Sequence, residues 1–144
     1  MILHAGLIAA RAAGRWIGVL IEGEAGVGKS DLALRALDCG FRLVADDRVV
    51  LWTSGGRLFG RAPDTLYGLI EVRGVDVLRI NSLPVAEVGL LARCGATERL
   101  PELRREAVLG VELPALTIAP LEASTPAKLR RAVALFDRDP KKRM

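Results

Sequence analysis

The chain has 144 residues, of which 51% are hydrophobic and 26% are charged, and its net charge is +4 at pH 7. This balance is typical of a folded globular protein and excludes an intrinsically disordered chain. We expect a single domain over residues 1–144, because this length allows one substantial core but no second lobe.

The apolar, cysteine and basic residues also exclude several kinds of location and partner. No apolar run approaches the roughly 18 residues that span a membrane, and His4 and Arg11 interrupt the N-terminal apolar stretch, unlike a signal peptide. Cys39 and Cys94 fit neither a disulfide framework nor a metal site, so we expect reduced, partly buried thiols in a cytoplasmic protein. Six aromatic residues without interleaved basic ones argue against nucleic acid and favour acidic partners.

The first two predicted elements are strands. Residues 1–13 have the apolar character of a strand or an edge strand, and His4 lies among them. On spacing alone, a lone histidine beside apolar neighbours is a structural residue. Residues 16–22 form the next predicted strand. It has apolar residues on both faces, as in a sheet that is covered on each side.

A glycine-rich motif, Gly-x-x-x-x-Gly-Lys-Ser, follows directly over residues 23–30, and a helical pattern continues to Gly40. Such a loop between strand and helix cradles phosphate groups, because backbone N–H groups and the helix N-terminus point to the same place. Lys29 is expected to bridge the β- and γ-phosphates, and Ser30 to ligate Mg²⁺. The expected nucleotide-binding residues are Gly23, Glu24, Ala25, Gly26, Val27, Gly28, Lys29, Ser30 and Asp31.

A second strand is predicted over residues 41–45, and it ends in the paired acids Asp46 and Asp47. Acids at the C-terminal end of a strand, one helix after a phosphate loop, fall where α/β sheets place ligands. Two adjacent acids can also form a simple polar turn. In this setting we expect them to coordinate Mg²⁺ and to supply a base for phosphoryl transfer.

The remaining elements are predicted from alternation, turn residues and helical spacing. Residues 81–95 are expected to hold a strand, although a helix is not excluded, and residues 97–101 a loop. The last helix begins at residues 124–126, and its apolar face should dock on the sheet. Further strands are predicted over residues 48–52, 57–59, 69–73, 77–80, 107–109 and 115–118.

Glu71 and Arg73 are two residues apart in a predicted strand and would therefore lie on one face. They could form an ion pair with a neighbouring strand. Alternatively, Glu71 could contact a metal or a nucleotide, because a carboxylate beside an arginine suits a phosphate-and-metal site. The residues alone leave both interpretations open.

Three motifs follow one another along most of the chain: residues 23–34, residues 39–49 with the paired acids, and residues 69–75, which read Leu-Ile-Glu-Val-Arg-Gly-Val. Many proteins share the first motif, but few share all three. In this order they resemble the bacterial HPr kinase/phosphorylase family. The resemblance implies an α/β fold, namely a P-loop nucleotide-binding domain of the PEP carboxykinase-like type with a central mixed sheet flanked by helices.

The resemblance also implies roles for the residues that match the family's motifs. Lys29 matches the phosphate-loop lysine, and Ser30 and Glu71 match the Mg²⁺ ligands, with Asp46 as a further metal contact. Asp47 matches the acid that takes the proton from the substrate serine.

Two further catalytic residues follow from the resemblance. His4, followed by Ala5-Gly6-Leu7, falls where the family has an active-site histidine. Arg99, within Glu-Arg-Leu, matches an active-site arginine.

The function implied is that of an ATP- and Mg²⁺-dependent serine kinase, and a candidate phosphorylase, acting on an HPr-like phosphocarrier of a phosphotransferase system. The resemblance further implies a homo-oligomer, a hexamer, of the short alphaproteobacterial form without the N-terminal domain. Residues 119–126 depart from a family segment that carries arginines and is tied to dephosphorylation. The alternative is therefore a nucleotide-binding regulatory protein that has lost phosphoryl transfer, and a small-metabolite kinase is a weaker one.

Overall fold

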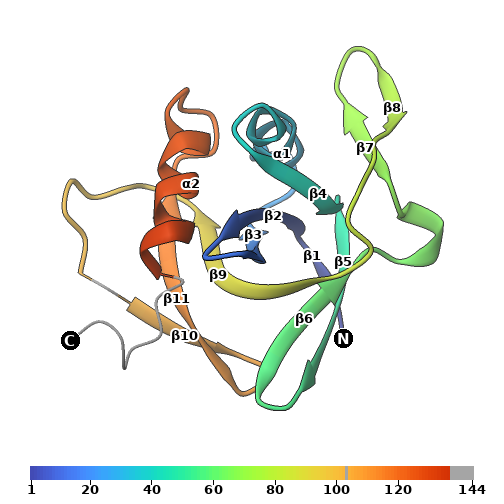
Figure 1. The fold of residues 1–144 in the computed structure, drawn as a ribbon. Helices are drawn as coiled ribbons and strands as arrows, with labels where there is room; N and C mark the ends of the chain where they lie inside the picture. Colours follow the sequence, from blue (N-terminus) through green and yellow to red (C-terminus); the bar gives the residue numbers. More distant parts are fainter. Residues whose placement is uncertain (103, 137–144) are drawn as a thin grey trace.

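Strands of both directions form the sheet at the centre of the molecule (Figure 1). The computed structural model describes residues 1–102 and 104–136. The strands are β1 Ile2–His4, β2 Gly6–Ala12, β3 Arg15–Glu22, β4 Phe41–Ala45, β5 Arg48–Ser54, β6 Arg57–Arg61, β7 Leu69–Val72, β8 Asp76–Arg79, β9 Ala86–Cys94, β10 Arg104–Val108 and β11 Val111–Ile118. The helices are α1 Lys29–Leu37 and α2 Thr125–Phe136, and η1 Asp64–Leu66 is a 3-10 turn.

The main sheet combines parallel and antiparallel pairs. Its strands follow the order β1-β5-β6-β9-β3-β2-β4, and β11 joins along the end of β9 and also pairs with β10. β3 and β11 run parallel to β9, whereas β2 is antiparallel to both β3 and β4. β7 and β8 form a separate two-stranded sheet. The predicted mixed sheet is therefore confirmed.

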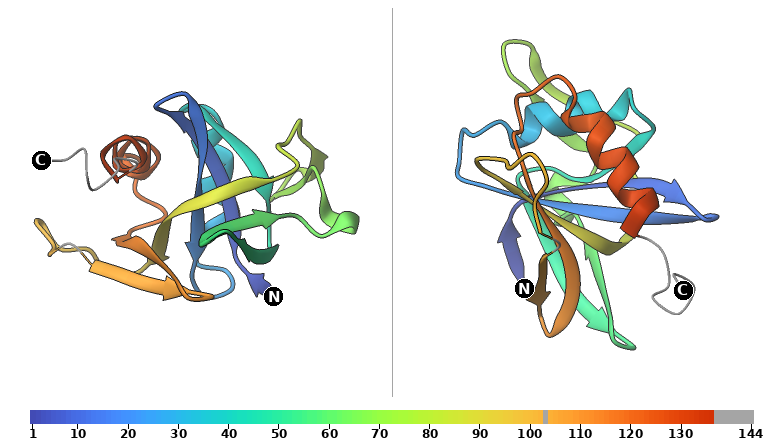
Figure 2. Two further views of the ribbon diagram at one scale, coloured as in Figure 1. Left: turned by 60° about the horizontal axis from the view of Figure 1, so that its bottom comes forward. Right: turned by 90° about the vertical axis from the view of Figure 1, so that its left-hand side faces the viewer.

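Two apolar cores lie on opposite faces of the central strands. In β2, Ile8 and Ala10 belong to one core, whereas Leu7 and Ala9 belong to the other, because alternate residues of a strand face opposite ways. Buried residues of both helices complete the first core, and residues of β5, β6 and β11 complete the second. Figures 1 and 2 show α1 and α2 on one side of the sheet and the β5–β6 and β10–β11 hairpins on the other.

Several predicted boundaries differ from the structure. α1 ends at Leu37 rather than at Gly40, because Asp38 and Cys39 donate to carbonyls three residues back and so tighten the last turn. Cys39 is consequently exposed, not partly buried. Leu109, predicted within a strand, has a φ of 49° and lies in the turn between β10 and β11.

The two later elements that matter for packing agree with expectation. Residues 81–95 contain a strand, β9, in which Ala86, Val88 and Leu90 alternate with less buried positions. α2 packs its apolar face, including Leu129 and Val133, into the first core. Within residues 1–102 and 104–136, neither helix has the length and apolar character needed to cross a bilayer.

Candidate active site

The ends of three neighbouring strands bring predicted site residues to one edge of the sheet. Since β2 is antiparallel to both β3 and β4, these two strands run in the same direction and end where β2 begins. The glycine loop follows β3, Asp46 and Asp47 follow β4, and His4 comes just before β2. The fold therefore gathers residues that are up to 43 positions apart in the sequence, from His4 to Asp47.

The glycine loop has the backbone that an anion-binding loop needs. Gly26 and Gly28 have φ values of 80° and 112°, in the left-handed region that favours glycine. α1 begins at Lys29, so its N-terminal N–H groups and positive dipole end lie at the loop. The Lys29 ammonium donates to the carbonyl oxygens of Gly23 and Glu24. The loop thus combines amide donors, a helix N-terminus and an ammonium group for an anionic ligand.

Asp46 connects the loop to the rest of the site. Its Oδ1 accepts a hydrogen bond of 2.7 Å from the Ser30 hydroxyl, and its Oδ2 accepts one of 3.2 Å from the Glu71 amide. The residue is only 7% exposed. Burial raises the pKa of Asp46, the hydrogen bonds from Ser30 and Glu71 oppose this shift, and the charge of Asp47 adds to it.

The environment of Asp46 fits a divalent cation. No ion pair in the described part of the chain involves this carboxylate. A buried charge held only by neutral donors is compensated when a cation binds beside it. The Ser30 hydroxyl and the Asp46 carboxylate are oxygen ligands of the kind that Mg²⁺ prefers. The described residues include no cluster of three His, Cys, Asp or Glu side chains able to hold a metal, so phosphate oxygens and water would complete the shell.

Asp47 differs sharply from its neighbour. It is exposed and has a φ of 69°, a conformation that costs free energy for a residue other than glycine. Two backbone bonds hold it there: the Ala5 N–H donates to the Asp47 carbonyl, and the Arg48 N–H donates to the Asp46 carbonyl. His4, also exposed, precedes Ala5 and pairs in register with Arg48. An accessible carboxylate and an imidazole therefore occupy neighbouring backbone positions.

The β7–β8 hairpin reaches the site through its backbone. The Glu71 amide binds Asp46, while the Glu71 side chain is exposed. Arg73 lies in the turn beyond β7, so the prediction that it shares a strand face with Glu71 was wrong. The reason is that the chain turns directly after Val72, with Gly74 at a φ of 82°. The described residues contain no ion pair between Glu71 and Arg73.

The segment after β11 lies against the phosphate loop, which sequence reasoning did not predict. A Cβ atom on Gly28 would lie 2.7 Å from Leu121 Cδ2, so the two residues are in close contact. Arg35 of α1 holds the segment by donating to the carbonyls of Pro120 and Glu122, and it also pairs with Asp31 at 2.9 Å. The spacing of Asp31 and Arg35, four residues apart on a helix, was the only signal of this anchor in the sequence.

Cys94 and Arg99 follow one another near the end of β9 but differ in their relation to the site. Cys94 lies under the loop, because a Cβ on Gly23 would be 2.8 Å from its Cβ. Burial raises the pKa of the Cys94 thiol, and the charge of Lys29 partly opposes this shift. Arg99 lies exposed in the connection between β9 and β10. Within the described residues, no hydrogen bond or ion pair links it to the other predicted site residues.

Comparisons with known proteins agree with this arrangement. Residues 5–87 match the model of the HPr Serine kinase C-terminal domain family. HPr kinase/phosphorylases from Clostridium perfringens and Brevibacillus brevis are 45% and 47% identical over 67 and 68 residues, which cover 46% of this chain and 22% of each relative. The chain therefore matches less than a quarter of their length.

One solved structure has a similar fold along nearly the whole chain. The Hpr(Ser) kinase/phosphatase from Coxiella burnetii superimposes with a TM-score of 0.73 and 28% identity, over 92% of this chain and 97% of that chain. This match confirms the predicted fold class, a mixed sheet flanked by helices.

Proposed function

Since the chain belongs to the HPr serine kinase C-terminal domain family, we propose that it is an ATP- and Mg²⁺-dependent serine kinase acting on an HPr-like phosphocarrier. The observation that carries this proposal is the junction at Asp46, which joins Ser30 at the start of α1 to the Glu71 amide. The junction sets an oxygen-ligand site beside the phosphate loop, and phosphoryl transfer needs these parts side by side.

Each group at this edge has a distinct proposed task. The loop amides and Lys29 hold the phosphates of ATP, and Ser30, Asp46 and Glu71 hold the magnesium ion. Bound magnesium supplies charge neutralisation for the phosphate oxygens. As the serine oxygen forms its bond to the γ-phosphorus, the bond from that phosphorus to the ADP oxygen breaks. The serine proton passes to the exposed carboxylate of Asp47.

His4 and Arg99 belong to the proposal with different support. His4 is exposed next to the backbone of Asp47, where an imidazole can exchange a proton with the carboxylate or with the acceptor serine. Arg99 rests on the family resemblance, and the exposed connection that carries it would have to bring its guanidinium to the phosphates. We include both as catalytic residues of the proposed enzyme.

The wider setting is proposed on the same grounds. The carrier would be an HPr-like protein of a phosphotransferase regulatory system, and the enzyme would be a cytoplasmic homo-oligomer with residues 1–144 as its catalytic domain. Relatives named kinase/phosphorylase and kinase/phosphatase support both directions of transfer. Residues 119–126 contain no arginine, so we place the forward reaction first.

The proposal is tested by incubating the purified protein with ATP, Mg²⁺ and an HPr-like carrier from the same organism. We expect the intact mass of the carrier to increase by one phosphoryl group, which peptide mapping assigns to a serine. Leaving out Mg²⁺ should abolish the increase. An unmodified carrier in the complete reaction would contradict the proposal.

A second function, a nucleotide-binding regulatory protein without phosphoryl transfer, is favoured by the contact between Leu121 and Gly28. This contact puts an apolar side chain beside the phosphate loop, in a segment without arginine. Tight binding of ATP without any modified carrier, together with nucleotide-dependent binding to a signalling protein, would support this second function.

A further inference from the structure

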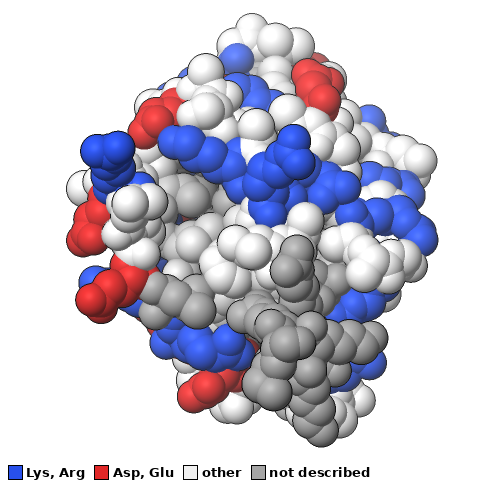
Figure 3. Space-filling model, turned by 60° about the vertical axis from the view of Figure 1, so that its left-hand side comes forward, with Lys and Arg blue, Asp and Glu red and all other residues white. Residues whose placement is uncertain are grey.

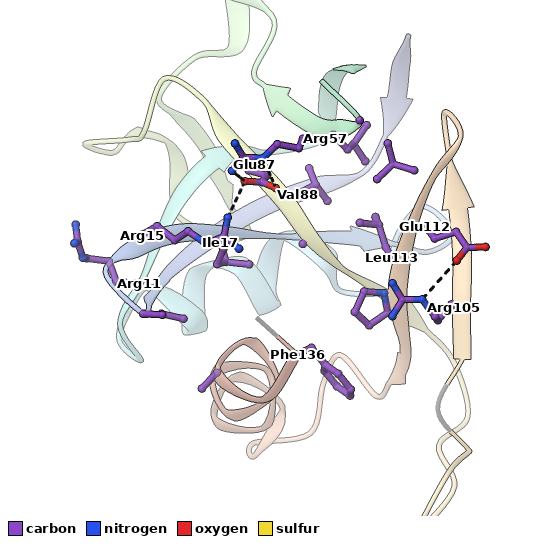
Figure 4. Close-up of a pocket in the computed structure, with 18 of the residues that line it drawn as sticks. Arg11, Arg15, Ile17, Arg57, Glu87, Val88, Arg105, Glu112, Leu113 and Phe136 are labelled. Atoms are coloured by element: carbon purple, nitrogen blue, oxygen red, sulfur yellow. Dashed lines mark hydrogen bonds and ion pairs between the residues drawn. The ribbon is translucent and has the colours of Figure 1, made fainter. Parts of the chain in front are cut away.

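A large cavity lies at the edge of the sheet opposite the phosphate loop. Its volume is about 1080 Å³, and its lining comes from the β2–β3 turn, the β5–β6 turn, the start of β9, the β10–β11 hairpin and the end of α2 (Figure 4). β3 begins at this cavity and ends at the glycine loop, so the two sites are at opposite ends of one strand. None of the residues assigned to phosphoryl transfer lines it.

Basic side chains outnumber acidic ones around the cavity. The charged lining residues are Arg11, Arg15, Arg57, Arg105, Arg130, Glu87 and Glu112. Lys and Arg side chains also form a band across the face that carries α2 (Figure 3). This excess of positive charge attracts anions to this side of the molecule.

On one side of the cavity, two guanidinium groups share a single carboxylate. Glu87 accepts hydrogen bonds of 2.5 and 3.1 Å from Arg57 and one of 3.1 Å from Arg15. Each guanidinium has five N–H donors, so donors remain after these bonds are made. The Arg57–Glu87 pair is bidentate, which is the geometry that a free carboxylate adopts on arginine.

A second basic group lies across the cavity. Arg105 faces Glu112 at 3.7 Å, a long ion pair whose glutamate side chain is 72% exposed. Such a pair contributes little and is readily exchanged for a better partner. In Figure 4, Val88 and Leu113 lie between this pair and the group around Glu87. Both side chains are nearly fully buried, at 2% and 4% exposure, so the floor between the two basic groups is apolar.

We propose that this cavity binds a small organic dianion with an acidic group at each end of an apolar body, such as an α,ω-dicarboxylate. One carboxylate would bind Arg57 and Arg15, the other would bind Arg105, and the chain between them would cover Val88 and Leu113. The volume is near the upper end of the range for small-molecule pockets. This inference does not depend on the kinase function.

The proposal is tested by calorimetric titration of the full chain with adipate, sebacate and dodecanedioate, and with decanoate as the monoacid matched to sebacate. We expect saturable binding at one site, with an optimum chain length and tighter binding of sebacate than of decanoate. Binding of mono- and diacids with equal affinity, or no saturable binding of any diacid, would overturn the proposal.

Variants locate the site. Arg57→Gln and Arg105→Gln should each weaken binding of the preferred diacid about tenfold, the loss expected for one charged hydrogen-bonded contact. Glu87→Gln should instead tighten binding, because it removes the carboxylate that competes for both arginines. Arg79→Gln, an exposed position in β8 outside the cavity, is the matched control and should change nothing.

Circular dichroism confirms that each variant is folded, and Glu87→Gln keeps the test decisive if either arginine variant unfolds. Unchanged affinity in Arg57→Gln, Arg105→Gln and Glu87→Gln would overturn the proposal.

Discussion

Asp46 and Asp47 are adjacent and chemically identical, yet the fold gives them different environments. Asp46 is buried and fully engaged by Ser30 and the Glu71 amide, whereas Asp47 is exposed on a left-handed backbone. A buried carboxylate with neutral donors suits a cation, and an exposed one can receive a proton from a bound substrate. The sequence predicted that the pair is functional but could not divide the roles, because burial depends on where β7 packs.

The thiol of Cys94 provides a test of the packing beneath the glycine loop. Burial raises its pKa above the ordinary value of 9.0, so less thiolate is present at a given pH and alkylation is slower. In a Cys39→Ser variant, iodoacetamide should modify Cys94 more slowly than it modifies a free cysteine peptide, and the rate should keep rising above pH 9.0. Mass spectrometry follows the modification. A rate equal to that of the peptide at neutral pH would contradict this packing.

At the scale of elements, the helix α2 closes the first core with one face and meets solvent with the other. Leu129 is fully buried, whereas Leu135 is 53% exposed. Leu129→Ala should lower the free energy of unfolding by about 2–5 kcal/mol, because it leaves a cavity among well-packed neighbours. The matched variant Leu135→Ala should change it by no more than about 0.5 kcal/mol. Urea unfolding followed by circular dichroism measures both, and equal effects would contradict the assigned face of α2.

Elements whose pattern is local could be predicted from the sequence. The strand, loop and helix over residues 16–37, the strand β4 and the helix α2 all follow from apolar spacing and from turn residues. The turn containing Arg73 could not be predicted, because strand-like residues continue past the point where the hairpin bends. The docking of residues 119–122 on α1 depends on Arg35, whose contacts are 85 and 87 positions away. Long-range contacts of this kind leave no periodic signal.

At the scale of the whole molecule, the strand order explains why the site was only partly predictable. The motifs indicated which residues carry phosphate chemistry, but only the pairing of β2 between β3 and β4 brings His4 to the same edge. The sequence also gave no indication that both helices cover one face while hairpins cover the other. Those features depend on how the sheet curls, which many residues determine together.

Nucleotide binding should stabilise the whole fold, because the loop is anchored to β3, α1 and, through Asp46, to β7. ATP with Mg²⁺ at about 100 times its dissociation constant should raise the free energy of unfolding by about 2.7 kcal/mol. Lys29→Met should reduce this gain, since the ammonium no longer binds phosphate. Lys128→Met, at an exposed position of α2, should retain it. Thermal unfolding measures the effect, and equal gains in both variants would contradict the assigned role of Lys29.

The most direct test of the account is the rate of phosphoryl transfer to the carrier in two matched variants, Asp47→Asn and Asp64→Asn. Asparagine tolerates the left-handed backbone at position 47, so the first variant should fold and still bind ATP. Asp64 is exposed in η1, outside the site. We predict a loss of about 100-fold or more in Asp47→Asn, the usual contribution of a general base, and a wild-type rate in Asp64→Asn. Equal rates in the two variants would contradict the assignment of this edge as the site of transfer.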